Sequence, residues 1–312
     1  MRLEVLHKAK SPEFNPTLIR YQKEAVSAPA NLTDLARWEM SRLSPAQTLA
    51  WLQTLPTTTR TNQPSALLMA ECQLAMKDWK GMQVSLQTQN WGDLDYERHG
   101  LLAWSLQKQN LDSSKAEWQE ALSATKNRLV ALKTLLGIAQ QLQWANQADQ
   151  ILWIIADFYP GDKDAWLTLR QNLIVTGRTR SLLQLTSIEL GRNPSELWLK
   201  NDLALIALLL NADEVKPHAL ALAAYNQDRT NASVASTYAF SLYLQGKPAE
   251  ALKVMQQLKA SQLADPGIAG YYGLVLKANG HKAEAISYLK LAANSQLLPE
   301  ERLLFTKAET DP

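Results

Sequence analysis

Apolar residues recur along most of this chain every three or four positions, which is the spacing of one face of an α-helix. The apolar runs are short, and turn residues separate them. One such break is Gly246-Lys247-Pro248-Ala249-Glu250-Ala251-Leu252, and a similar one, Gly280-His281-Lys282-Ala283-Glu284-Ala285-Ile286, follows 34 residues later. Each break lies between two apolar runs. The pattern therefore predicts two successive pairs of antiparallel helices, each joined by a short turn.

Small residues occupy matching positions in the two predicted hairpins. Ala239 precedes Ala251 by twelve positions, and Gly273 precedes Ala285 by the same spacing. Because the distance between two packed helices depends on the side chains at their contact, small residues at both places predict a close approach of the two helices.

The same pattern continues toward the N-terminus. Hairpin starts fall near residues 31, 65, 95, 129, 163, 195, 231 and 266, and prolines at 160, 194, 266 and 299 keep the same phase. A fixed period in this range indicates stacked helical hairpins. We predict an array of about eight hairpins over residues 31–298. An irregular segment with room for one short helix precedes it over 1–30, and a capping helix and tail follow over 299–312.

The two C-terminal copies resemble the tetratricopeptide repeat, a two-helix unit of about 34 residues. The resemblance is strongest over residues 231–298 and looser over 31–230. It implies an all-α, right-handed superhelical solenoid with a concave groove that binds peptides or other proteins. It implies no chemistry.

Charge, cysteine content and targeting signals bear on the ligand and the compartment of the protein. The net charge is +2, with acidic and basic residues interleaved, so no basic footprint for nucleic acid is visible and we expect no nucleic-acid ligand. Cys72 is the only cysteine, which excludes an intrachain disulfide. No signal peptide or membrane-spanning run is present. We expect a cytoplasmic protein, and a signal or membrane anchor outside this sequence stays open.

No group of residues in the sequence points to catalysis. The four histidines (His7, His99, His218 and His281) lie far apart, and no HExxH or Cys-x-x-Cys motif occurs, so we predict no metal site. No nucleophile motif or phosphate-binding loop is present. We predict a non-catalytic protein without cofactor or catalytic residues. Most of the ten tryptophans should pack in the core, whereas Trp91, in a turn, should be the one most exposed to solvent.

The resemblance also implies a ligand surface on the first helix of each hairpin. In the last three hairpins this surface would include Leu199, Leu203, Ile206, Ser236, Phe240, Tyr243, Leu274 and Lys277. The set is apolar for a solvated surface. Two interpretations stay open: a groove for an apolar or amphipathic segment, or burial of these side chains against other repeats by tight superhelical coiling.

These observations favour a scaffold or adaptor that binds a protein or peptide segment in its concave groove. One alternative is an accessory repeat segment of a larger membrane-anchored or enzymatic assembly, because the chain begins abruptly. A second alternative is an RNA-binding helical repeat, which the near-neutral charge and the Leu-rich helices disfavour. Apolar surface at either end of the array could also join two copies into a homo-oligomer.

Overall fold

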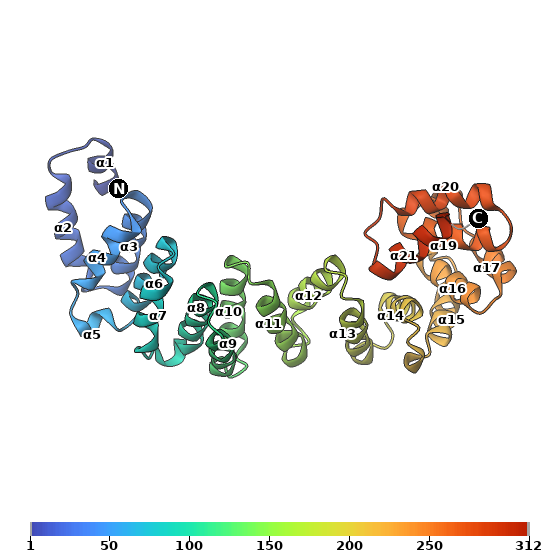
Figure 1. The fold of residues 1–312 in the computed structure, drawn as a ribbon, viewed down its shortest axis with the longest axis horizontal. Helices are drawn as coiled ribbons and strands as arrows, with labels where there is room; N and C mark the ends of the chain where they lie inside the picture. The colour runs from blue at the N-terminus through green and yellow to red at the C-terminus, as the bar shows by residue number, and fades with distance from the viewer. Residues whose placement is uncertain (1, 311–312) are drawn as a thin grey trace. The chain divides into compact units, whose positions relative to one another are not determined.

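The computed structural model describes residues 2–310, and within that range every regular element is a helix (Figure 1). The chain divides into two compact units, Met1–Lys163 and Asp164–Pro312, which we call the N-terminal unit and the C-terminal unit. No helix within residues 2–310 combines the length and the apolar character that crossing a bilayer requires.

The N-terminal unit begins with α1 (Arg2–Lys8) and α2 (Phe14–Ala25). Four hairpins follow: α3 (Pro29–Arg42) with α4 (Pro45–Gln53), α6 (Ser65–Met76) with α7 (Trp79–Gln87), α8 (Asp95–Lys108) with α9 (Ser113–Ala124), and α10 (Leu129–Gln141) with α11 (Ala145–Phe158). Two short helices, α5 (Thr57–Arg60) and η1 (Gly92–Leu94), lie in the connections.

The C-terminal unit contains four more hairpins: α12 (Lys163–Val175) with α13 (Thr179–Arg192), α14 (Leu197–Leu210) with α15 (Pro217–Gln227), α16 (Ala232–Leu244) with α17 (Pro248–Met255), and α19 (Pro266–Ala278) with α20 (Lys282–Ala292). The short elements η2 (Asp213–Val215) and α18 (Ala260–Leu263) lie in connections, and α21 (Pro299–Thr310) is the last helix.

The eight hairpins confirm the prediction of an all-α helical repeat. The predicted starts agree with the first helices of the hairpins, and the largest difference is two residues, at Pro29 and at Leu197. The right-handed superhelical winding of the whole array stays a prediction.

Residues 1–30 contain two helices, α1 and α2, where the sequence predicted an irregular segment with one short helix. Only Leu3 is buried in α1, and only Thr17 and Ala25 are buried in α2. α1 spans only seven residues, which is shorter than the stretch over which a helical period can be recognised in a sequence. Met1 and residues 311–312 lie outside the described residues.

Local sequence explains where the hairpin helices begin and end. Side chains of Ser44, Asp78 and Asp265 each accept a hydrogen bond from a backbone N–H of the helix that follows, which satisfies a donor that the helix itself leaves unpaired. Gly246 and Gly280 follow α16 and α19 with φ of +73° and +86°. Glycine adopts this left-handed conformation without steric cost, so both residues end a helix and start the turn.

The close helix approach predicted from the small residues is present between α19 and α20. A Cβ atom on Gly273 would lie 2.8 Å from Leu289 Cγ and 3.1 Å from the carbonyl oxygen of Ala285. In the preceding hairpin, Ala239 and Ala251 are both fully buried. The small residues therefore set the spacing of these helix pairs.

Candidate binding groove

The first helices of the four N-terminal hairpins, α3, α6, α8 and α10, line an open groove with a volume of about 650 Å³. We call it the N-terminal groove. Its lining residues are Arg37, Met40, Leu67, Glu71, Leu74, Ala75, Glu97, Leu101, Thr134, Ile138, Gln141 and Leu142. All of them belong to the N-terminal unit.

The floor of the N-terminal groove is apolar and partly open to solvent. Leu67, Leu74, Ile138 and Leu142 are half-buried, and Leu101 is buried. These side chains come from three successive first helices and the turn that follows α10. A contiguous apolar surface in a concave site is typical of a surface that a ligand covers.

The groove holds two carboxylates and one guanidinium. Arg37 Nη2 donates to Glu71 Oε1 at 2.9 Å, and this bond raises the pKa of Arg37. Glu97 is buried, and the Tyr96 hydroxyl donates to its Oε1 at 3.1 Å. Burial raises the pKa of the Glu97 carboxyl, the Tyr96 hydrogen bond opposes this rise, and the charge of Glu71 adds to it. Within residues 2–310, no Lys, Arg or His side chain forms an ion pair with Glu97.

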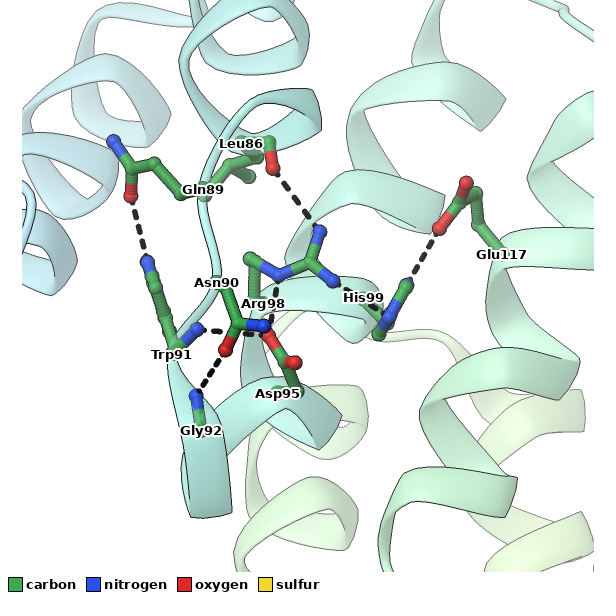
Figure 2. A network of polar contacts seen from close by, with 9 residues as sticks. All are labelled: Leu86, Gln89, Asn90, Trp91, Gly92, Asp95, Arg98, His99 and Glu117. Carbon is green, nitrogen blue, oxygen red and sulfur yellow. Dashed lines mark hydrogen bonds and ion pairs between the residues drawn. The ribbon is translucent and has the colours of Figure 1, made fainter.

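A polar network fixes the start of α8, the helix that carries Glu97 and Leu101 into the groove (Figure 2). Arg98 is buried. Its Nε donates to Asp95 Oδ1 at 2.5 Å, and its Nη1 donates to the carbonyl oxygen of Leu86 at 3.1 Å. The guanidinium thereby joins the end of α7 to the first turn of α8.

The same guanidinium determines the proton position on His99. Arg98 Nη2 lies 2.7 Å from His99 Nε2, and His99 Nδ1 lies 2.7 Å from Glu117 Oε2. A guanidinium can only donate hydrogen bonds, so Nε2 accepts and Nδ1 carries the proton that it donates to Glu117. His99 thereby connects α8 to α9.

Trp91 is part of this junction and is buried, so the prediction that it is the tryptophan most exposed to solvent is wrong. Its indole Nε1 donates to Gln89 Oε1 at 2.6 Å, and its backbone N–H donates to Asp95 Oδ1 at 2.9 Å. The turn folds back so that the indole packs on the core formed by α6, α7 and α8. Trp91 can be buried although it lies in a turn, because Gln89 and Asp95 accept the hydrogen bonds of its two N–H groups. Its position in a turn does not predict these bonds.

Replacing Arg98 by Met is expected to destabilise the N-terminal unit by about 3 kcal/mol, because the change leaves Asp95 and the Leu86 carbonyl without their buried donor. Urea denaturation of the purified chain measures this loss. Arg128→Met is the matched control: its guanidinium reaches Asp93 of the same turn from the exposed side, and its loss is expected to cost less than about 1 kcal/mol. Equal losses for the two variants would contradict a special role for the buried guanidinium.

The eight residues predicted as a partner groove all lie in the C-terminal unit, on α14, α16 and α19. Six are buried (Leu199, Leu203, Ile206, Ser236, Phe240 and Leu274), and two are half-buried (Tyr243 and Lys277). The chain's own last helix covers part of this set: Phe240, Tyr243 and Leu274 pack in one apolar cluster with Phe305 of α21. Binding of a partner through these residues stays a prediction.

The N-terminal groove was not among the predicted sites, although the sequence contains a signal for it. Arg37 and Glu71 are 34 positions apart, and so are Leu67 and Leu101. One repeat length places each pair at equivalent positions on successive first helices. The lining of this groove mixes charged and apolar residues. The residues predicted as a groove in the C-terminal hairpins are mostly apolar, and that character was one basis of the prediction.

Two further features bear on chemistry. No group of three or more His, Cys, Asp or Glu side chains within residues 2–310 is placed to hold a metal ion. Cys72 is fully buried on α6, and burial raises the pKa of its thiol to about 12. A thiol with so high a pKa is protonated at neutral pH and therefore unreactive as a nucleophile.

Neither a protein-family model nor a curated protein sequence matches the chain. Solved structures do match. YrrB, described as a TPR protein with an unusual peptide-binding site, shares 12% identity at a TM-score of 0.36, over 62% of this chain and 97% of that chain. A tetratricopeptide repeat protein from Parabacteroides merdae shares 14% identity at a TM-score of 0.38, over 78% of this chain and 92% of that chain.

The Cut9–Hcn1 hetero-tetramer of APC/C matches at 14% identity and a TM-score of 0.27, over 90% of this chain and 73% of that chain. The first two structures bear the name of the repeat that the C-terminal hairpins resemble. The assignment of the fold to helical-hairpin repeats rests on the eight hairpins of the chain itself.

Proposed function

We propose that the chain is a non-catalytic scaffold that binds a protein segment in the N-terminal groove. One observation carries the proposal: half-buried apolar side chains and the buried Glu97 carboxylate share an open groove on successive first helices. The ligand that fits this chemistry is an apolar segment that bears a Lys or Arg side chain.

The apolar floor supplies the affinity in this proposal. Leu67, Leu74 and Ile138 still expose part of their surface, and covering it releases about 25 cal/mol per Å² of apolar area. The groove is formed by helices that are already packed, so binding does not require them to become ordered, which lowers the entropic cost.

Glu97 supplies the specificity. A Lys or Arg of the ligand would pair with a carboxylate that is shielded from water, and such a pair favours the ligand with the matching charge over others. The two carboxylates of the groove also argue against a polyanion such as RNA, because nucleic-acid binding depends on Lys and Arg contacts to phosphate.

Selection of random peptides displayed on phage against the immobilised chain tests the proposal. We expect enrichment of apolar sequences that contain Lys or Arg. An Ile138→Glu variant should bind the selected peptides at least about tenfold more weakly, because a charge then occupies the floor. Val84→Glu is the control: Val84 is exposed on α7, which does not line the groove, and this variant should bind as the unaltered chain does.

The Glu97→Gln variant separates the two contributions. It keeps the shape of the groove and removes its buried charge, so it should lose the preference for Lys or Arg while still selecting apolar peptides. Selected peptides that bind Ile138→Glu and Val84→Glu equally well would refute the assignment of function to this groove.

A further inference from the structure

The last helix, α21, contacts the first hairpin of the C-terminal unit as well as the last one. Thr179, at the start of α13, donates through Oγ1 to Glu300 Oε2 at 2.6 Å, across 121 positions of sequence. A Cβ atom on Gly177 would lie 2.7 Å from Pro299 Cγ. The helix therefore begins against the turn between α12 and α13, rather than only closing the end of the last hairpin.

The middle of α21 inserts an aromatic ring among the first helices of the unit. Phe305 is buried and packs in one cluster with Leu208 of α14, Phe240 of α16 and Tyr271 of α19. Its ring meets the Tyr271 ring edge-on, with centroids 5.1 Å apart. A Cβ atom on Gly270 would lie 2.4 Å from the Phe305 ring, so glycine is the residue that leaves room for it.

A carboxylate of α21 is bound just as closely. Glu301 is buried, the Tyr271 hydroxyl donates to its Oε1, and the backbone N–H of Leu298 donates to its Oε2 at 2.8 Å. Glu301 and Phe305 lie four positions apart and so point from the same face of the helix. Tyr271 contacts both of them and thus recognises an acid and an aromatic ring one turn apart.

Little else of α21 is buried. Glu301 and Phe305 are its buried residues, whereas Leu303 is 72% exposed on another face. Near the end of the helix, Lys277 Nζ donates to the carbonyl oxygen of Ala308 at 2.8 Å. This is the contact pattern of an amphipathic helix lying in a groove, where anchors at i and i+4 enter pockets.

We propose that the surface formed by α14, α16, α19 and the turn between α12 and α13 is a second, helix-binding groove. In this structure α21 occupies it as an intramolecular ligand. The external ligand that fits this groove is a partner helix with Glu and Phe four residues apart. The Tyr271 hydroxyl would donate a hydrogen bond to the Glu, and the Phe ring would occupy the space that Gly270 leaves free. Phe240, Tyr243, Leu274 and Lys277, which the sequence singled out, are then groove residues that α21 covers.

Two experiments on the whole 312-residue chain test this proposal. In the first, hydrogen exchange is followed in the unaltered chain. An intramolecular ligand opens without unfolding the surface beneath it, so amides of α21 should exchange at least about tenfold faster than the core amides of α16 and α19. Exchange of all three helices at one common rate would show that α21 is an integral part of the core and would overturn the proposal.

In the second experiment, a fluorescent peptide with the sequence of residues 295–310 is titrated into the whole 312-residue chain. Phe305→Ala weakens the internal helix without altering the groove, so this variant should bind the peptide at least about tenfold more tightly than the unaltered chain does, because less competition remains. Leu303→Ala, at an exposed position of the same helix, should bind it as the unaltered chain does. Should Phe305→Ala fail to fold, Thr179→Val removes one tether of α21 and serves in its place.

Peptides that carry Glu301→Ala or Phe305→Ala should lose binding to the Phe305→Ala chain, because each lacks one of the two anchors. Equal binding of the unaltered peptide to all chains, or no binding to a folded Phe305→Ala chain, would refute the second groove. Neither outcome depends on the N-terminal groove, so the two proposals fail or succeed separately.

Discussion

Replacing Glu39 by Gln is expected to stabilise the N-terminal unit by about 3 kcal/mol at pH 8 and to remove most of its pH dependence. Glu39 is 1% exposed on α3, and Gln22 Nε2 donates to its Oε1 at 3.0 Å. Burial disfavours the charged carboxylate and raises its pKa from 4.5 to about 7, although the Gln22 hydrogen bond opposes this rise.

The direction of the pH effect follows from these two pKa values. The unfolded chain releases the Glu39 proton near pH 4.5, whereas the folded chain holds it up to about pH 7. The folded state binds the proton more tightly, so the stability gained from it is fully present below pH 4.5 and is lost as the pH rises through 7. Glutamine is neutral at every pH and keeps the same shape, so it avoids the cost of the buried charge.

Urea denaturation at about pH 5 and about pH 8 measures the effect through the change in unfolding free energy. The unaltered chain should be less stable at the higher pH, and Glu39→Gln should show a much smaller difference. Some difference should remain, because burial also raises the pKa of Glu97. Glu120→Gln alters an exposed carboxylate of the same unit and should reproduce the unaltered profile. A Glu39→Gln chain that loses stability as steeply as the unaltered one would disprove the assignment.

Replacing Gly273 by Ala is expected to destabilise the C-terminal unit by about 2 kcal/mol, although alanine is normally the better residue in a helix. The added methyl group would lie 2.8 Å from Leu289 Cγ and 3.1 Å from the Ala285 carbonyl oxygen. The side chain of Leu289 can move aside, but the backbone of α20 cannot move without shifting the whole helix. The two helices must therefore separate, and their buried contacts loosen.

Gly191→Ala provides the matched control in the same unit. Gly191 lies in the last turn of α13, and a Cβ atom there would meet nothing within 4 Å. This change should leave stability unaltered or raise it by up to about 1 kcal/mol, since alanine costs less backbone entropy than glycine. Thermal denaturation compares the two variants directly. A rise in melting temperature for both would mean that the close contact at Gly273 does not limit helix packing.

Sequence could predict the hairpins because each one is encoded locally. Gly246 and Gly280 mark two turns, and prolines begin several of the helices. The small residues Ala239 and Gly273 mark the side of each first helix that packs against the second helix. Each of these signals lies within one repeat length, so it can be recognised from residues that recur at that spacing. That is why the predicted hairpin starts deviate from the observed ones by two residues at most.

The sites depend on contacts that local signals do not encode. Thr179 meets Glu300 across 121 positions, and that meeting results from the small rotations that accumulate between successive hairpins. The N-terminal groove likewise brings together Arg37 and Thr134 from the first and fourth hairpins. Neither its depth nor the burial of Glu97 can be derived from helix periodicity alone.

The position of α21 has a consequence for folding of the C-terminal unit during synthesis. The hairpins of the C-terminal unit can form one after another as they emerge from the ribosome, because each contacts mainly its neighbours. Tyr271 nevertheless lacks its ring contact with Phe305, and the apolar cluster around Phe240 stays incomplete, until α21 has been made. A nascent chain that stalls before Pro299 therefore presents an uncovered apolar surface, the kind of surface that promotes aggregation and chaperone binding.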